Sequence, residues 1–160
     1  MRKITTEKES ELREFLRGIT SQIDKIERLV DEIPNIGSNP HEITSEMLDE
    51  LVEYLRSDVL PEITELCDLI KSYAGSIIAF KDGKKIISEF NQVLEKTTRL
   101  VDIAEQLRDL IKKHATNNLV TELISMFNEY VETLRTFFSE KVHNMLDKIL
   151  ELLRKIDSVL

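Results

Sequence analysis

The feature that most constrains this chain is the spacing of its apolar residues. Hydrophobic residues recur at alternating steps of three and four along four segments, which places them on one face of an α-helix in each segment. Helix-breaking stretches separate the segments: "PNIGSNPHEI" at 34–43, Asp82-Gly83, and "HATNN" at 114–118. The pattern predicts four long helices, the second beginning near Thr44 or Ser45, since both residue types are good helix N-caps.

The connections between the predicted helices indicate how they are arranged. Short turns between the last three helices favour antiparallel neighbours. Only 4 Gly and 3 Pro occur in a chain that is 41% hydrophobic and 32% charged, a composition typical of long helices. We therefore predict an all-α fold, an antiparallel up-down-up-down four-helix bundle, formed by a single domain over residues 1–160.

Two of the predicted helices interrupt the alternation of steps near their middle. Two consecutive steps of four occur in each of these, at Leu55, Val59 and Ile63 and at Leu134, Phe138 and Val142. Such steps shift the apolar seam locally. Pro61 also lies in the second helix, where it removes a backbone hydrogen bond and clashes with the preceding turn. We predict a kink or break near residues 56–60, and we hypothesise that the two irregularities are matched where helices pack together.

The unequal helix lengths suggest a surface for a partner. At 1.5 Å per residue the first helix spans about 40 Å and the fourth about 60 Å. We predict that all four helices meet at the end that carries the loops 34–43 and 114–118, so that the last three helices, including the C-terminal part of the fourth, overhang at the other end. That part, "MLDKILELLRKIDSVL", widens its apolar stripe with four leucines: Leu146, Leu150, Leu153 and Leu160. We expect these residues to bind a protein partner or a second copy of the chain, unless residues 1–6 extend the first helix and cover them.

Charge and composition exclude several classes of function. The net charge of −8, with scattered basic residues, disfavours binding to nucleic acid or to an anionic membrane surface. No apolar run approaches the roughly 18 residues that a membrane-spanning helix needs. The N-terminus "MRKITTEKES" lacks the apolar region of a signal peptide, so a cytoplasmic protein without membrane insertion is expected. Cys67, the only cysteine, falls among leucines and is predicted to be a small buried residue.

The sequence offers little for catalysis, and we expect no enzyme activity and no cofactor. A di-iron bundle needs two Glu-x-x-His motifs, and the chain has one, Glu140 to His143. Nucleophile elbows and glycine-rich phosphate loops are absent from the sequence. One alternative stays open: Arg108 and His114 resemble the Arg-x4–6-His element of HEPN-type helical ribonucleases. The resemblance implies that these two residues would act on a scissile phosphate.

A row of acidic residues follows the outer face of the third predicted helix. Glu95, Asp102, Glu105 and Asp109 lie opposite its apolar seam, and Arg99 and Arg108 are placed to form ion pairs with them. A solvated, charged helix face is the simplest interpretation. The alternative is a divalent metal such as Mg²⁺ or Ca²⁺ held by the carboxylates of Asp102, Glu105 and Asp109, because hard cations prefer oxygen ligands.

The segment "RLVDIAEQL" at 99–107 resembles the repeated helical signature of the PhoU family. Asp102, Ala104 and Glu105 match the signature in type, and the helix spacing over residues 60–115 is also similar. The acidic residue expected four positions before Asp102 is Thr98 here. The resemblance implies a non-enzymatic regulator that docks on a transporter or kinase, with metal at the carboxylate face. We therefore expect an interaction or regulatory protein, with a HEPN-like ribonuclease or a purely structural self-associating bundle as alternatives.

Overall fold

A computed structural model describes residues 6–37, 39–79, 81–114 and 118–159. As predicted, these residues form helices joined by loops, and none of them lies in a strand. The α-helices are α1 (Thr6–Asp31), α2 (Ser45–Tyr54), α3 (Leu60–Ser72), α4 (Ala74–Ile77), α5 (Gly83–Lys112), α6 (Asn118–Thr136) and α7 (Val142–Val159). A 3₁₀ turn, η1 (Pro40–Glu42), lies in the first loop, and two π-helical turns, η2 (Leu55–Val59) and η3 (Phe137–Lys141), join α2 to α3 and α6 to α7.

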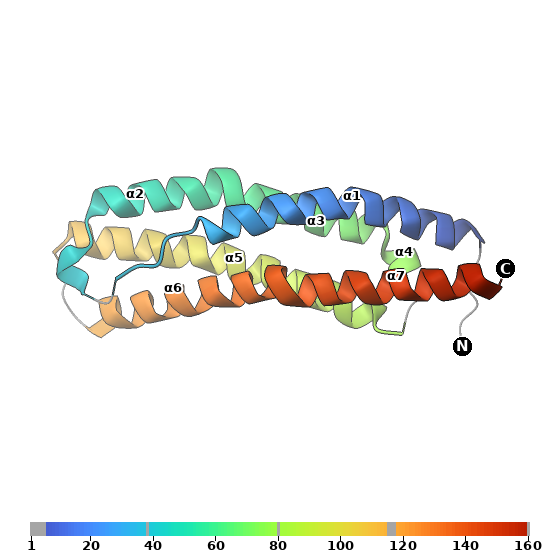
Figure 1. Ribbon diagram of the computed structural model, residues 1–160. Helices are drawn as coiled ribbons and strands as arrows, with labels where there is room; N and C mark the ends of the chain where they lie inside the picture. The colour runs from blue at the N-terminus through green and yellow to red at the C-terminus, as the bar shows by residue number, and fades with distance from the viewer. Residues whose placement is uncertain (1–5, 38, 80, 115–117, 160) are drawn as a thin grey trace.

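The molecule is elongated, and its long helices share one core. Figure 1 shows α1, the stretch from α2 through α3, α5, and the stretch from α6 through α7 side by side along the long axis. Each contributes apolar side chains to a single cluster of buried residues, which includes Ile23, Leu66, Leu100 and Phe127. Among the described residues, no helix is long and apolar enough to cross a membrane.

Two helix starts are explained by local sequence. Thr44 caps α2 as predicted, its side-chain oxygen accepting a hydrogen bond from the backbone N–H of Met47 at 3.2 Å. Gly83 begins α5 where the chain passes very close to the end of α4. A Cβ atom at Gly83 would lie 1.9 Å from the carbonyl oxygen of Ile77, so only glycine fits the present backbone.

The two π-helical turns coincide with the two double steps of four. The N–H of Leu60 donates to the carbonyl of Leu55, and that of Val142 donates to the carbonyl of Phe137, in both cases five residues back. A π turn accommodates one extra residue, so side chains spaced by two steps of four stay on the core face. Pro61 follows as the second residue of α3, near the start of a regular helix. The predicted irregularity takes the form of a π turn rather than a break, and a bend of the helix stays a prediction.

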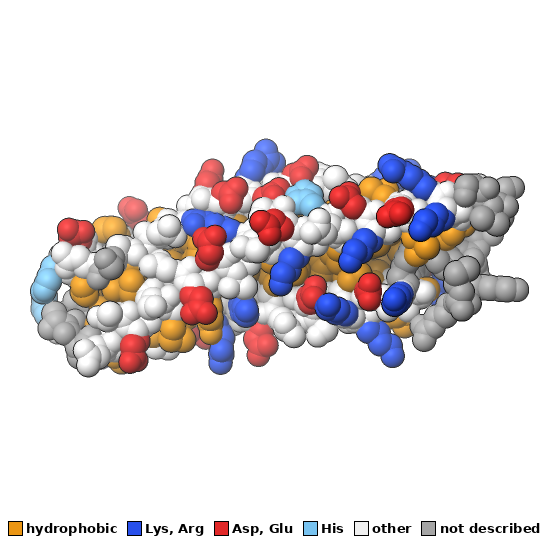
Figure 2. Space-filling model, turned by 60° about the horizontal axis from the view of Figure 1, so that its bottom comes forward, with side chains coloured by type: hydrophobic (Ala, Val, Ile, Leu, Met, Phe, Trp, Pro, Cys, Tyr) orange, Lys and Arg blue, Asp and Glu red, His pale blue; other side chains and the backbone are white. Residues whose placement is uncertain are grey.

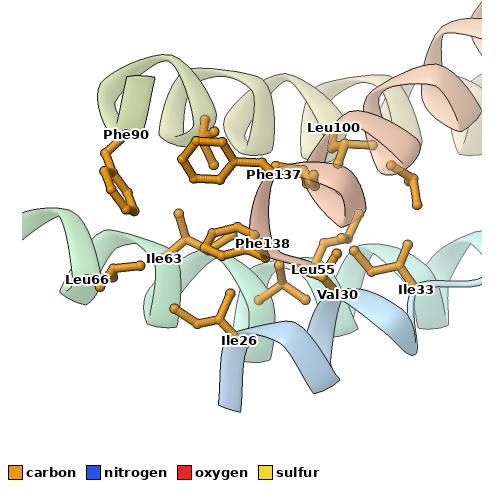
Figure 3. Packing of buried hydrophobic residues seen from close by; sticks show 14 of the residues in the cluster. Ile26, Val30, Ile33, Leu55, Ile63, Leu66, Phe90, Leu100, Phe137 and Phe138 are labelled. Atoms are coloured by element: carbon orange, nitrogen blue, oxygen red, sulfur yellow. The ribbon is translucent and has the colours of Figure 1, made fainter. Parts of the chain in front are cut away.

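Both π turns pack against the same neighbour. η2 and η3 each contact α1. Figure 3 shows Phe138 of η3 pointing into the interior, with Leu55 and Ile63 of the α2–α3 stretch and Ile26 and Val30 of α1 around it. Phe138 is fully buried, and its ring stacks edge-to-face with Phe137 at a centroid distance of 5.2 Å. The extra residue of η3 thus places a large aromatic side chain at the centre of the core.

The position of α1 corrects the length argument made from sequence. α1 lies beside the C-terminal part of the fourth predicted helix (Figure 1), where Arg13 forms an ion pair with Asp157 at 2.5 Å and Glu27 lies 3.3 Å from Nε2 of His143. The end that α1 does not reach is the one where α2 and α6 begin. The prediction that all four helices meet at that end was therefore wrong.

An extended loop takes the place of α1 at that end. The described residues 32–37 and 39–44 run along the bundle there, and three isoleucines of this loop are buried: Ile33, Ile36 and Ile43. Extended chain covers about 3.3 Å per residue against 1.5 Å in a helix, so the extended parts of the loop span more distance per residue than α1 would. We call residues 32–44 the anchored loop, because side chains of α6 hold it in place, as described next.

Candidate functional site

A groove between the anchored loop and α2 is the more apolar of two candidate sites. It has a volume of about 420 Å³, within the range of small-ligand and side-chain pockets. Its lining is Glu32, Pro34, Asn35, Ile36, Ile43, Met47, Leu48, Glu50, Leu51 and Tyr54. We call this the α2 groove. Most of its lining is apolar, and its two acidic residues, Glu32 and Glu50, come from the loop and from α2 respectively.

Two polar residues of α6 hold the loop wall of the α2 groove. The side-chain amide of Asn128 accepts from the backbone N–H of Ile36 at 3.0 Å and donates to the carbonyl of the same residue at 2.9 Å. Arg135 donates to the carbonyl of Ile33 at 2.6 Å and to the side chain of Asn35 at 3.2 Å. These bonds satisfy backbone groups that a nonhelical segment would otherwise leave unpaired. The loop wall is therefore fixed from behind, and its front faces the groove.

The floor of the α2 groove is buried, while one large apolar side chain stands at its edge. Ile36, Ile43, Leu48 and Leu51 are each less than 9% exposed. Met47, by contrast, is 54% exposed, the most exposed large hydrophobic side chain in the described residues. An unbranched methionine at the edge of an apolar depression adapts readily to different partner surfaces.

Tyr54 forms one end of the α2 groove and is tied to α1. Its hydroxyl donates to the backbone carbonyl of Leu29 at 2.5 Å. Burial raises the pKa of Tyr54 to about 12, and the negative charges of Glu32 and Asp58 act in the same direction. The phenol is therefore held in its neutral, donating form.

Tyr54 is expected to contribute to stability only below strongly alkaline pH. Its folded-state pKa lies above the unfolded value of about 10, so its contribution is complete below about pH 10 and is lost as pH rises toward 12. Urea unfolding of the wild type and of Tyr54→Phe between pH 9 and 12 tests this. The difference in free energy of unfolding between the two proteins should shrink over that range. A difference that stays constant would show that the phenol titrates alike in both states.

The predicted metal ligands do not gather around a site. Asp102 and Asp109 are exposed; Glu105 is ion-paired with Arg56 of η2, and Asp109 lies 3.6 Å from Nε of Arg108. No group of three or more His, Cys, Asp or Glu side chains among the described residues is placed to hold a metal ion. This geometry favours the interpretation of a charged outer face with arginine partners.

Arg108 and His114, the residues of the ribonuclease alternative, lie in different surroundings. The Nε of Arg108 is 3.6 Å from Asp49 of α2, so this side chain turns toward the neighbouring helix. His114 is exposed just beyond the end of α5 and adopts a positive φ of 55°, as residues that end helices often do. No hydrogen bond or ion pair joins these two described residues.

The leucines predicted to bind a partner are mostly used by the chain itself. Leu146 and Leu153 are buried, whereas Leu150 is 40% exposed; Leu160 lies outside the described residues. A regular alternation of steps from Val142 would run through Met145, Ile149 and Leu152, but after η3 a further step of four places Leu146, Ile149 and Leu153 inward. The stripe looks wide in the sequence because Met145 and Leu152, which are half-buried beside this row, are also apolar. Of the four leucines, Leu150 alone presents a described, exposed side chain.

A second groove lies between α5 and the junction of α6 with η3. It has a volume of about 510 Å³ and a floor formed by Val93 and Phe137. Three glutamates and two lysines line it together: Glu89, Glu129, Glu132, Lys96 and Lys141. Figure 2, which brings the α6–α7 side forward, shows hydrophobic side chains in a strip between charged side chains of both signs. Mixed charges give this groove no preference for a ligand of one sign.

Cys67 is buried, as predicted. Its thiol donates to the carbonyl of Phe90 at 3.5 Å, and burial raises its pKa to about 11. Since the thiolate is the reactive form, this cysteine is a packing residue rather than a nucleophile.

Comparison of the chain with family models, with curated proteins and with solved structures gave no match. The assignment of a function therefore depends on the geometry of the chain alone. Sequence reasoning missed the α2 groove, because it treated residues 34–43 as a plain loop. A signal was present: isoleucine at positions 33, 36 and 43 is too apolar for a solvated connection.

Proposed function

We propose that this chain is a non-enzymatic interaction protein, an antiparallel up-down-up-down four-helix bundle that docks a segment of a partner protein in the α2 groove. The observation that carries the proposal is an apolar groove with a pre-formed wall. Asn128 and Arg135 hold that wall without help from a ligand. A wall that is already ordered lowers the entropy cost of binding.

The positions of the exposed apolar side chains favour docking at the α2 groove rather than at the C-terminal leucines. Met47 lies at the edge of a depression, whereas Leu150 lies on α7 between the buried Ile149 and the exposed Glu151. A single exposed leucine is ordinary for a protein surface, but an exposed methionine beside a 420 Å³ apolar groove is typical of a binding surface.

A regulatory role like that implied by the PhoU resemblance is one form of this proposal. It would add a divalent metal at Asp102, Glu105 and Asp109, and Glu105 would first have to leave Arg56. The interaction at the α2 groove does not depend on that metal. We therefore propose the docking function as the primary one.

Selection from a random peptide library displayed on phage tests the proposal. Peptides enriched on the wild type should lose binding to Met47→Gln, which removes the apolar edge but keeps helix propensity. The matched control is Met126→Gln, since Met126 is also exposed (39%) but lies on α6 outside the groove. Enriched peptides should bind this control as they bind the wild type. If no peptide is enriched, or if enriched peptides bind Met47→Gln equally well, the docking proposal is wrong.

A further inference from the structure

We propose that the partner segment is an amphipathic helix that is basic, with apolar side chains for the α2 groove and Lys or Arg beside them. This inference rests on the proposed docking function and adds the chemistry of the partner. It is carried by the charge of the groove, by the hydrogen bonding of its wall and by its size.

The charge of the α2 groove has one sign. Glu32 and Glu50 are its two charged residues, and no lysine or arginine is among the described residues that line it. Neither carboxylate forms an ion pair with a described residue. Two arginines near the groove have partners of their own: Arg135 bonds the back of the loop, and Arg56 is paired with Glu105. A partner that brings Lys or Arg to the groove would pair with carboxylates that are otherwise free.

The wall of the α2 groove does not offer backbone groups at its central residue. Both the N–H and the carbonyl of Ile36 are bonded to Asn128, so this residue has no free N–H for the ladder of a partner strand. Recognition therefore falls to side chains. Side chains projecting from one face of a helix at i, i+3 or i+4 are the usual way to fill an apolar groove.

The size of the α2 groove limits how much of the partner is buried. A volume of about 420 Å³ holds a few side chains rather than a whole helix. The partner helix would lie across the opening, insert its apolar side chains against Leu48 and Leu51, and contact Met47 at the edge. The chain's net charge of −8 would steer a basic segment toward it over longer distances.

Two synthetic helical peptides test the inference. Both carry leucine on one face; one has lysine and the other glutamate on the polar face. Binding to the wild type is measured by fluorescence anisotropy at several salt concentrations. We expect the lysine peptide to bind, its affinity to fall with added salt, and the glutamate peptide to bind more weakly by about tenfold or more.

Charge-reversal variants separate docking in the groove from general attraction to an acidic protein. Glu50→Lys should lower the affinity for the lysine peptide by about threefold to tenfold, as expected for the loss of one or two partly exposed charge interactions. Glu122→Lys makes the same change in net charge on an exposed residue of α6 outside the groove, and it should have a clearly smaller effect. Met47→Gln should also weaken binding, and Met126→Gln should not. Equal effects of Glu50→Lys and Glu122→Lys would overturn the inference.

The remaining outcomes distinguish this inference from the proposed function. If the glutamate peptide binds as well as the lysine peptide, and Met47→Gln weakens both, the partner chemistry is wrong while docking in the groove stands. If neither peptide binds and the display selection also yields none, the docking function itself fails. Sedimentation tests whether a second copy of the chain occupies the α2 groove. A dimer of the wild type that Met47→Gln dissociates would assign the groove to that second copy and overturn the inference.

Discussion

Deleting Ser139 is expected to leave the protein folded, whereas deleting Thr98 is expected to unfold it. Both residues are exposed and lie in long helical stretches, so neither deletion removes a core side chain. The difference lies in the π turn. Ser139 belongs to η3, which holds one residue more than a regular helix needs, while Thr98 lies in the uninterrupted α-helix α5.

The spacing of buried residues gives the reason for this contrast. Without Ser139, the steps from Phe138 through Val142, Leu146, Ile149 and Leu153 become three, four, three and four, which is the seam of a regular α-helix. The π turn can close to an α turn, and the residues on both sides keep their faces. Without Thr98, the step from Thr97 to Leu100 becomes two. Each residue turns a helix by about 100°, so the second half of α5 would rotate its core residues away by that angle.

Circular dichroism and urea unfolding of the two deletion variants measure the outcome. The Ser139 deletion should change the free energy of unfolding by about 1 kcal/mol or less, comparable to an ordinary surface change. The Thr98 deletion should remove most or all of the roughly 5–15 kcal/mol that stabilises a domain. Equal losses of the free energy of unfolding in the two variants would show that η3 does not absorb a change of register. The double step of four would then not be explained by the extra residue of the π turn.

Replacing Phe138 with alanine should cost about 3–5 kcal/mol of the free energy of unfolding. Phe138 is fully buried, and Figure 3 shows it at the centre of the core, between side chains from α1 and from the α2–α3 stretch. Its removal leaves a cavity that the surrounding helices cannot fill without moving. The edge-to-face contact with Phe137 is lost as well, and such pairs add about 0.5–1.5 kcal/mol beyond burial.

Urea unfolding followed by circular dichroism provides the measurement for Phe138. Leu119→Ala is the control, because Leu119 is 45% exposed on α6 and its truncation should cost little. If Phe138→Ala does not fold, Phe138→Leu serves in its place and should cost about 1–1.5 kcal/mol, since most of the volume is kept. A loss for Phe138→Ala as small as that of Leu119→Ala is incompatible with the central position of this ring.

Local spacing was enough to predict the long helical stretches of this chain, although not the short helix α4 or the 3₁₀ turn η1. The seams identified the helices, Thr44 identified a helix start, and the double steps of four identified the places where the structure has π turns. All of these depend on residues within one or two turns of each other. The inward role of Leu146 and Leu153 in α7 was missed, because a further step of four follows the π turn and the alternative row through Met145 and Leu152 is equally apolar.

What the sequence did not reveal depends on contacts between distant segments. Asn128 and Ile36 are 92 positions apart, and Arg135 and Ile33 are 102 apart. Neither pair has a local signal, yet together they set the path of the anchored loop, the position of α1 and the existence of the α2 groove. The helix lengths show that α1 is too short to span the bundle, but they do not show at which end it stops short. We predicted the wrong end.

The long α6–η3–α7 stretch also makes the molecule a spacer. From Asn118 to Val159 it covers about 60 Å at 1.5 Å per residue, and its last turns lie beside the first turns of α1 through the Arg13–Asp157 ion pair. The α2 groove is at the opposite end, where α2 and α6 begin (Figure 1). A surface, tag or second protein joined at the α1–α7 end would therefore hold the groove at a distance of tens of ångströms from the point of attachment.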